Sequence, residues 1–153
     1  MAKIDVKTIR KLRDETGASI VRITKVLDEV GGDEGKACEI LKKEGFEKAA
    51  KRSDRETNQG VLKTYVHHSG KLVSIVELLC ETDFVAKNDL FITLANDLAM
   101  QVASMGANSV DDLIAQDFIK DPSKKVENLV RDVIAKTGEN VRIGRIFRVE
   151  LGK

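Results

Sequence analysis

At residues 72–80 the chain reads Leu-Val-Ser-Ile-Val-Glu-Leu-Leu-Cys, and at residues 81–88 it continues Glu-Thr-Asp-Phe-Val-Ala-Lys-Asn. The first segment is apolar and rich in β-branched residues, which predicts a strand buried on both faces. After the second segment, apolar residues recur three and four positions apart and predict an amphipathic helix: Leu90, Phe91, Leu94, Ala95, Leu98, Ala99 and Val102. An acid, an aromatic and a polar cap residue therefore lie where a strand passes into a helix. Such a junction can hold accessible side chains on rigid elements, as a recognition site requires.

The residues at this junction have a purely structural interpretation as well. Thr82 or Asp83 can cap the helix, because both residue types accept hydrogen bonds from the first free backbone N–H groups. Phe84 would then pack into the core of its own chain. On residue chemistry alone, this structural interpretation is favoured over recognition.

The first 45 residues predict three short amphipathic helices. Each helix has a polar residue suited to cap its start: Asp5, Ser19 and Asp33. Each is followed by glycine that can end it: Gly17, Gly31-Gly32 and Gly45. The second helix carries its apolar residues at Ile20, Ile23, Val26, Leu27 and Val30. Helices this short are marginal alone, so we expect a three-helix bundle over residues 1–45.

Residues 46–59 predict a helical tail and a charged linker. Basic residues such as Lys48, Lys51 and Arg52 alternate with acidic ones such as Glu47 and Asp54, a pattern typical of a solvated helix. The polar segment 53–60 has nothing apolar to bury. It is therefore the expected domain boundary.

Residues 60–153 predict an α+β core. Residues 61–66 and 72–80 flank a loop at residues 67–71 and predict a β-hairpin. A short helix that contains Phe118 is expected near residue 110, and Pro122 is placed to begin the next helix, which ends at Gly138. Residues 141–151 nearly alternate and predict a third strand with its even-numbered arginines exposed. The expected product is a three-stranded antiparallel sheet packed with helices.

Composition and motifs argue against catalytic, metal and nucleotide sites. Lys plus Arg number 26 and Asp plus Glu 25, whereas nucleic-acid binders usually carry a basic excess. There is no glycine-rich phosphate loop, and no nucleophile forms a recognisable constellation with His and Asp. His67 and His68 are adjacent, and adjacent strand residues point to opposite faces, so they do not converge on one ion. We expect a protein that is not an enzyme and that has no cofactor and no metal site.

Cellular location is predicted from what the sequence contains. The two cysteines, Cys38 and Cys80, have no metal-ligand spacing and are expected to be buried thiols in a reducing compartment. No charged-then-apolar leader pattern opens the chain, and no apolar run approaches the roughly 20 residues that span a bilayer. We therefore expect a cytoplasmic protein without a membrane segment.

Three motifs in order resemble a known family. Thr82-Asp83-Phe84-Val85-Ala86 resembles the signature of the bacterial translation elongation factor Ts family. Leu12-Arg13-Asp14-Glu15-Thr16-Gly17-Ala18 is similar to its Leu-Arg-x-x-Thr-Gly-Ala segment, and Lys136-Thr137-Gly138-Glu139-Asn140-Val141 to its Lys-Ile-Gly-Glu-Asn-Ile segment. The resemblance covers essentially the whole chain. One departure is Arg22-Ile23-Thr24, where the family has Asp-Cys-Lys; Ile23 is expected to fill the buried Cys position.

The resemblance implies a guanine-nucleotide exchange factor that binds GDP-bound elongation factor Tu. It implies that the bundle is similar to a ubiquitin-associated domain and docks on the partner's GTPase domain. Phe84 would project outward, insert near the partner's nucleotide site and help displace magnesium, with Thr82, Asp83 and Val85 also at the contact. Further partner contacts are implied at the matching positions of the other two motifs: Leu12, Arg13, Thr16, Gly17, Gly138, Glu139 and Asn140. Short family members pair two chains, which implies a homodimer.

Two rival functions remain open on sequence. An RNA- or ribosome-associated module would use Lys48, Lys51, Arg52 and the arginines of the last strand, although the charge balance speaks against direct nucleic-acid binding. A bundle-mediated adaptor would need no role for Phe84. These alternatives differ in whether salt or Phe84 controls partner binding.

Overall fold

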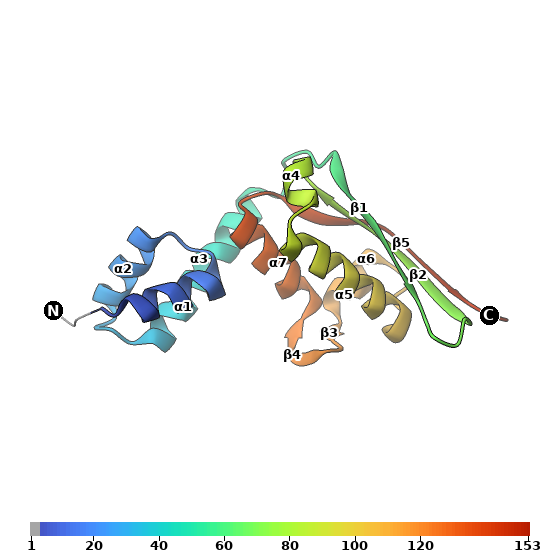
Figure 1. Cartoon of the computed structure of the whole chain (residues 1–153), viewed down its shortest axis with the longest axis horizontal. Coiled ribbons are helices and arrows are strands. Elements are labelled where there is room, and N and C mark those ends of the chain that lie inside the picture. Colours follow the sequence, from blue (N-terminus) through green and yellow to red (C-terminus); the bar gives the residue numbers. More distant parts are fainter. Residues whose placement is uncertain (1–3) are drawn as a thin grey trace.

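The computed structural model describes residues 4–153 and has an α+β architecture, as predicted. A bundle of three N-terminal helices lies at one end, and a sheet covered on one face by helices forms the rest (Figure 1). Residues 1–3, the start of the predicted bundle, lie outside the described residues. The proposed division into domains at residues 45 and 60 stays a prediction.

The bundle consists of α1 (Val6–Thr16), α2 (Ile20–Glu29) and α3 (Glu34–Lys51). The three predicted caps are confirmed: Asp5 accepts from the N–H of Lys7 at 3.1 Å, Ser19 from that of Arg22 at 3.3 Å, and Asp33 from that of Lys36 at 3.0 Å. One small apolar cluster holds the helices together: Leu12, Ile23, Val26, Leu27, Ala37 and Leu41. Ile23 is fully buried, as expected for its replacement of Cys.

The prediction that Gly45 ends the third helix is wrong. The helix α3 runs through Gly45 without a break and ends at Lys51. A Cβ built on Gly45 would lie 3.2 Å from the Cβ of Ala135, on α7 (Val126–Thr137). Gly45 therefore allows α3 to pass close to α7, and the bundle is joined to the rest of the chain by helix packing.

Gly17 makes a second close contact between the bundle and α7. Its φ is +70°, and a Cβ there would lie 2.8 Å from the Cα of Lys136. The left-handed conformation costs a residue with a Cβ about 1–2 kcal/mol, and overpacking adds about 1–3 kcal/mol. We expect Gly17→Ala to lower the free energy of unfolding by the sum of these two amounts, as measured by chemical denaturation.

The matched control for Gly17→Ala is Gly31→Ala. Gly31 has nearly the same φ, +67°, but nothing lies within 4 Å of its built Cβ. Gly31→Ala should therefore lower the free energy of unfolding only by the cost of the left-handed conformation, about 1–2 kcal/mol. Equal losses in the two variants would show that the contact between Gly17 and Lys136 is unimportant.

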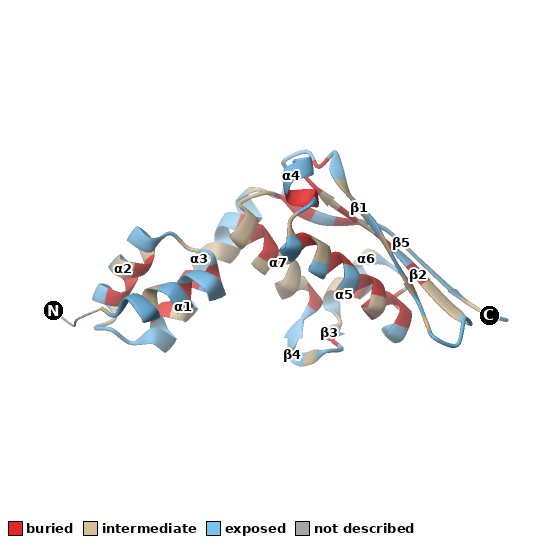
Figure 2. Ribbon diagram, viewed as in Figure 1, coloured by how far each residue is buried: buried red, intermediate tan, exposed pale blue. Residues whose placement is uncertain are grey.

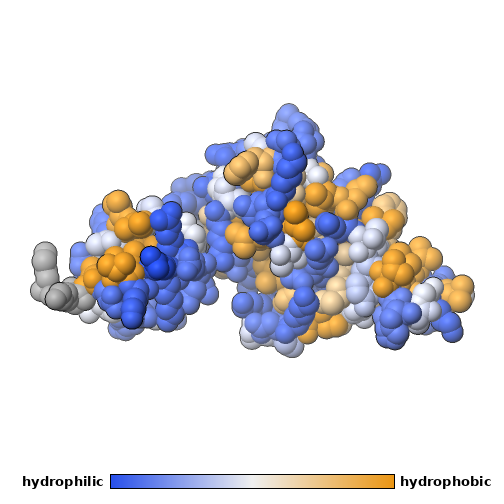
Figure 3. Space-filling view, viewed as in Figure 1, coloured by the Kyte–Doolittle hydropathy of each residue, from blue (hydrophilic) through white to orange (hydrophobic). Residues whose placement is uncertain are grey.

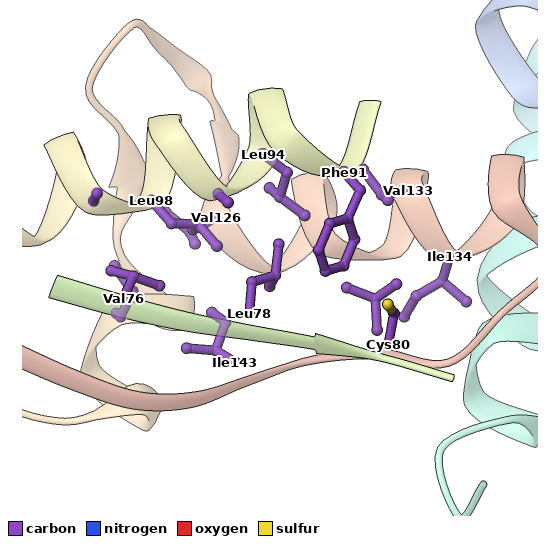
Figure 4. Close-up of a cluster of buried hydrophobic side chains, with 14 of the residues drawn as sticks. Val76, Leu78, Cys80, Phe91, Leu94, Leu98, Val126, Val133, Ile134 and Ile143 are labelled. Atoms are coloured by element: carbon purple, nitrogen blue, oxygen red, sulfur yellow. The ribbon is translucent and has the colours of Figure 1, made fainter. Parts of the chain in front are cut away.

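The sheet contains three antiparallel strands in the order β1-β2-β5. They are β1 (Gln59–Val66), β2 (Leu72–Cys80) and β5 (Val141–Glu150). The helices α4 (Asp83–Ala86), α5 (Asp89–Met105), α6 (Val110–Ala115) and α7 lie on one face of it (Figures 1 and 2). Phe91, Leu94 and Leu98 of α5 point toward Val76 and Leu78 of β2, and side chains of α7 and β5 complete the core (Figure 4).

The prediction that β2 is buried on both faces is wrong for the single chain. Val76, Leu78 and Cys80 face the helices and are fully buried, whereas Ile75, on the other face, is exposed. The hairpin and the third strand are confirmed, and their outer face is not covered by any described part of the chain.

A β-bulge changes the expected alternation of β5. Val76 pairs with Ile146 and Leu78 with Ile143, so β5 holds one extra residue opposite Glu77. Arg142 and Arg148 therefore lie on opposite faces of the sheet, although both residues are exposed, as predicted. Arg148 donates to the carbonyl of Ala103 at 3.0 Å, beneath the sheet.

The segment after α6 also differs from the prediction. Phe118 and Pro122 were expected in helices, but they belong to a small second sheet of β3 (Asp117–Phe118) and β4 (Asp121–Lys125). Proline lacks a backbone N–H and is tolerated in an edge strand of this kind. The following helix, α7, begins only at Val126 and ends, as predicted, at Gly138. None of the helices within residues 4–153 combines the length and apolar character that crossing a membrane requires.

Candidate functional site

The candidate site is the four-residue helix α4, which directly follows β2. Thr82 is its N-cap, and the Thr82 hydroxyl accepts from the N–H of Val85 at 3.4 Å. Val85 and Ala86 are buried against the core and anchor the turn from below. A new helix then begins, because Asn88 accepts from the N–H of Leu90 at 2.9 Å and caps α5.

Phe84 points away from this anchored turn. Its exposed fraction is 79%, whereas Phe91, seven residues later, is fully buried. Successive helical residues are about 100° apart, so a turn that buries Val85 and Ala86 turns Phe84 outward. The structural interpretation of the junction was therefore half right: Thr82 caps the helix, but Phe84 is not part of the core.

Asp83 lies beside Phe84 and is also accessible. Its carboxylate is 3.4 Å from the ammonium of Lys87, one turn later, and both side chains are exposed. A surface hollow next to Phe84 is lined by Asp83, Lys87, Asn88 and Asp89. The site thus combines an exposed aromatic ring, a solvent-exposed pair of opposite charges and a shallow hollow beside the ring.

Glu139, in the short connection between α7 and β5, supports α4. One oxygen of its carboxylate accepts from the backbone N–H groups of Glu81 and Thr82, at 3.2 and 3.0 Å. The other oxygen accepts from the Thr82 hydroxyl at 2.7 Å. We call these three hydrogen bonds the Glu139 clamp.

A second set of contacts runs in the opposite direction. The Glu81 carboxylate accepts from the N–H of Asn140 at 2.6 Å, and the buried Asn140 amide donates to the carbonyl of Arg55 at 2.8 Å. Arg142 donates to Thr57 at 2.6 Å, and Thr57 is buried. The segment before β1 was expected to bury nothing, but these contacts attach it to the start of β5.

The structure brings the three sequence motifs into one connected region. Gly17 lies against Ala135 and Lys136 of α7, and Glu139, just after that helix, holds Thr82. Gly138 ends α7 with a φ of +76° and turns the chain toward β5. The motifs are separated in sequence because each belongs to a different element of this region.

The motif residues differ in accessibility. Arg13, Asp83 and Phe84 are exposed, and Glu139 is half-buried and occupied by the clamp. Thr82 is exposed as well, but its hydroxyl is held by the clamp. Four other predicted residues are buried inside the chain: Leu12, Thr16, Val85 and Asn140. Thr16, for example, donates its hydroxyl to the carbonyl of Leu12 at 2.6 Å. Arg13, Asp83 and Phe84 are therefore the predicted residues that are accessible outside the clamp.

An exposed apolar pair on the bundle was missed from the sequence. Ile20 was expected inside, but it is exposed, and the neighbouring Val21 has an exposed fraction of 80%. They begin α2, beside the Ser19 cap. The position of Val21 could have indicated this exposure, because this apolar residue lies outside the apolar stripe of α2. Figure 3 shows hydrophobic side chains gathered on the bundle, at the left.

Burial determines the chemistry of the two cysteines. Burial raises the pKa of the Cys80 thiol to about 11, and burial also raises the pKa of Cys38. Both thiols are therefore poor nucleophiles near neutral pH. Across residues 4–153, no three His, Cys, Asp or Glu residues lie close enough together to hold a metal ion.

Comparisons with known proteins agree on one family. Residues 81–153 match the family described as Elongation factor TS. A protein of Oleidesulfovibrio alaskensis with the name Elongation factor Ts is 35% identical over an alignment of 197 positions, which covers 99% of this chain and 100% of that protein. Proteins of the same name from Clostridium kluyveri and Clostridium botulinum are 41% and 40% identical over 150 residues. Those alignments cover 98% of this chain and 49% of each clostridial protein, so the chain spans about half their length.

Proposed function

Because the chain belongs to the elongation factor Ts family of translation elongation factors, we propose that it promotes the release of GDP from elongation factor Tu. The observation that carries this proposal is the exposure of Phe84 on a capped and anchored turn. Phe84 inserts near the nucleotide site of the partner and helps to displace its magnesium ion. Asp83 provides polar contacts beside the ring. The chain acts as a binding protein and makes or breaks no covalent bond.

The energetics require more than one contact. Acceleration of GDP release by about 10⁴ corresponds to a barrier lower by roughly 5.5 kcal/mol. Burial of one Phe contributes about 1.5–3 kcal/mol, and a hydrogen bond to a charged group contributes a similar amount. Together they amount to about 3–6 kcal/mol before the cost of ordering is subtracted, which only just reaches this requirement, so other surfaces must contribute binding free energy as well. Ile20 and Val21 on the bundle and the exposed Arg13 are the accessible groups that support such a second contact.

Thermodynamic linkage provides the test of this function. If the chain weakens the binding of GDP to elongation factor Tu, GDP must weaken the binding of the chain by the same factor. Calorimetric titration of the chain into nucleotide-free and into GDP-saturated partner should give a much higher affinity in the nucleotide-free state. Equal affinities in the two states would refute an exchange function, even if the complex is tight.

The RNA-binding alternative gains no support from the arginines of β5. Arg142 donates to Thr57, Arg145 forms an ion pair with Glu77 at 3.0 Å, and Arg148 donates to Ala103. On α2, Arg22 is likewise paired with Glu44 of α3. Phosphate binding would have to displace these partners, so the geometry favours the protein partner.

The outer face of the sheet supports a homodimer, which is part of the proposal. Apolar side chains from all three strands project from the face opposite the helices: Leu62, Val66, Ile75, Phe147 and Val149. Figure 3 shows hydrophobic side chains near the far end of the sheet, at the right. In the middle of this face Arg145 pairs with Glu77, and hydrogen bonding to Arg145 holds the pKa of the Glu77 carboxyl below its usual value. An apolar sheet face of this kind is typical of an interface between two copies.

We expect Phe147→Asp to convert the dimer into monomers. Phe147 has an exposed fraction of 53% in the single chain, so the substitution should leave the monomer folded. In the dimer it would bury an unpaired charge, which is strongly unfavourable. Sedimentation equilibrium should therefore give a dimer for the wild-type chain and a monomer for the variant.

The matched control for Phe147→Asp is Val21→Asp. Val21 is even more exposed but lies on the bundle, so this variant should stay dimeric. A wild-type chain that is monomeric at high micromolar concentration would contradict the homodimer. A dimer that survives Phe147→Asp would place the interface on another surface.

A further inference from the structure

We infer that Glu139 is a positioning residue for Phe84, and that it acts through the hydroxyl of Thr82. This inference rests on the proposed function and names the group that controls the site. It changes the role expected for Glu139, from a contact with the partner to a support inside the chain.

The helix α4 is too short to hold its own shape. It contains four residues, and the first turn of a helix is unfavourable because several dihedral angles are fixed for one hydrogen bond. Its geometry therefore depends on the cap at Thr82 and on the buried anchors Val85 and Ala86. The anchors fix the lower side of the turn, and the cap fixes where it starts.

Glu139 determines how the capping hydroxyl of Thr82 is oriented. A threonine hydroxyl has one hydrogen to donate and two lone pairs that accept. Thr82 donates its hydrogen to the Glu139 carboxylate at 2.7 Å, so its lone pairs remain free for the N–H of Val85. A bond to a charged acceptor is stronger than a neutral one and polarises the hydroxyl, which strengthens the second bond in the chain.

The same carboxylate also fixes the backbone before the turn. It holds the N–H groups of Glu81 and Thr82, which are the last two residues before α4. Glu139 itself is held in place because its own N–H donates to Thr137 at 3.4 Å and because Gly138 ends α7 directly before it. The clamp thus connects the end of one rigid helix to the start of the exposed turn.

Such a clamp matters because the ring must enter the partner in one orientation. Ordering a mobile side chain during binding costs free energy, and a side chain that is ordered beforehand avoids this cost. Without the clamp, Phe84 would remain exposed and apolar but would no longer be oriented. We therefore expect a loss in the rate of nucleotide release rather than a loss of complex formation.

The experiment compares Glu139→Ala with Glu139→Gln and with Glu127→Ala. The Ala variant removes all three hydrogen bonds, whereas the Gln variant keeps a carbonyl that can accept and should recover most of the activity. Glu127 is a half-buried residue of α7 that, within residues 4–153, forms its ion pair with Arg131 alone, so it is the matched control. At saturating factor we expect Glu139→Ala to lower the release rate of a fluorescent GDP analogue about tenfold, with little change in the concentration for half-saturation.

A double-mutant cycle with Phe84→Ala separates positioning from direct contact. If Glu139 acts through Phe84, Glu139→Ala should cause no further loss once the ring is gone. The same loss with and without Phe84 would overturn the inference and make Glu139 a contact of the partner. An unchanged rate in Glu139→Ala alone would overturn it too.

Amide hydrogen exchange of the free chain provides a readout that is independent of the partner. The N–H groups of Glu81, Thr82 and Val85 should exchange faster in Glu139→Ala, and those of the core strand β2 should not. If these amides keep their wild-type protection, the clamp does not order the turn and the inference fails. If wild-type chain does not accelerate GDP release at all, the proposed function fails, and the amide result still decides whether the clamp exists.

Where Glu139→Ala does not fold, Thr82→Val serves in its place. It has almost the same shape, keeps both backbone bonds to Glu139 and removes only the hydroxyl relay. It should show the same faster exchange at Val85 and the same dependence on Phe84. A wild-type release rate in Thr82→Val would overturn the relay through the hydroxyl.

Discussion

Phe84→Ala is expected to slow factor-promoted GDP release by about 10- to 150-fold, because the 1.5–3 kcal/mol from burial of the ring in the partner is lost. Stability should not change, since the ring is 79% exposed and touches little of its own chain. The measurement is stopped-flow release of a fluorescent GDP analogue from elongation factor Tu, together with thermal unfolding of the variant.

Ile119→Ala is the control for this prediction. Ile119 is another exposed apolar residue, placed between β3 and β4 and away from α4. Its truncation should leave the release rate unchanged. If Phe84→Ala retains the wild-type rate, the ring does not act on the nucleotide site. The acceleration of release would then have to come from another surface, such as the exposed pair Ile20 and Val21.

Phe91→Ala, unlike Phe84→Ala, should act on stability and lower the free energy of unfolding by about 3–5 kcal/mol. Phe91 is fully buried and is the largest of the fully buried side chains, and it lies between α5 and the end of β2 (Figure 4). Its truncation leaves a cavity where the helix that follows the site packs on the sheet. Urea denaturation followed by circular dichroism measures the loss.

The two phenylalanines are matched controls for each other, since they share chemistry and lie seven residues apart. Phe84→Ala should shift the denaturation midpoint little, and Phe91→Ala should shift it strongly. A loss below about 1 kcal/mol for Phe91→Ala would mean that the core collapses around the gap and that the packing described here is looser than the burial indicates.

Much of the fold follows from local sequence signals. The caps Asp5, Ser19 and Asp33 and the hairpin of β1 and β2 were predicted, because each depends on residues close in sequence. Gly45 was misassigned, since its role is a close approach to Ala135, some ninety positions later. The sheet of β3 and β4 was missed because Pro122 also suits a helix start.

The candidate site was found from sequence only in part. The junction of strand and helix and the cap at Thr82 follow from residue types. The direction of Phe84 cannot be predicted in this way, because it depends on which neighbouring side chains the core buries. Residue chemistry alone favoured a buried Phe84, whereas the ring is exposed. The family resemblance indicated the exposed ring. The Glu139 clamp joins residues more than fifty positions apart, and no local pattern predicts it.

Release of GDP from elongation factor Tu at increasing concentrations of wild-type chain tests the exchange function most directly. A release rate that rises far above the spontaneous rate and saturates would support it, because saturation shows that release occurs within the complex. A rate that stays at the spontaneous value, while the folded chain demonstrably binds the partner, would contradict it.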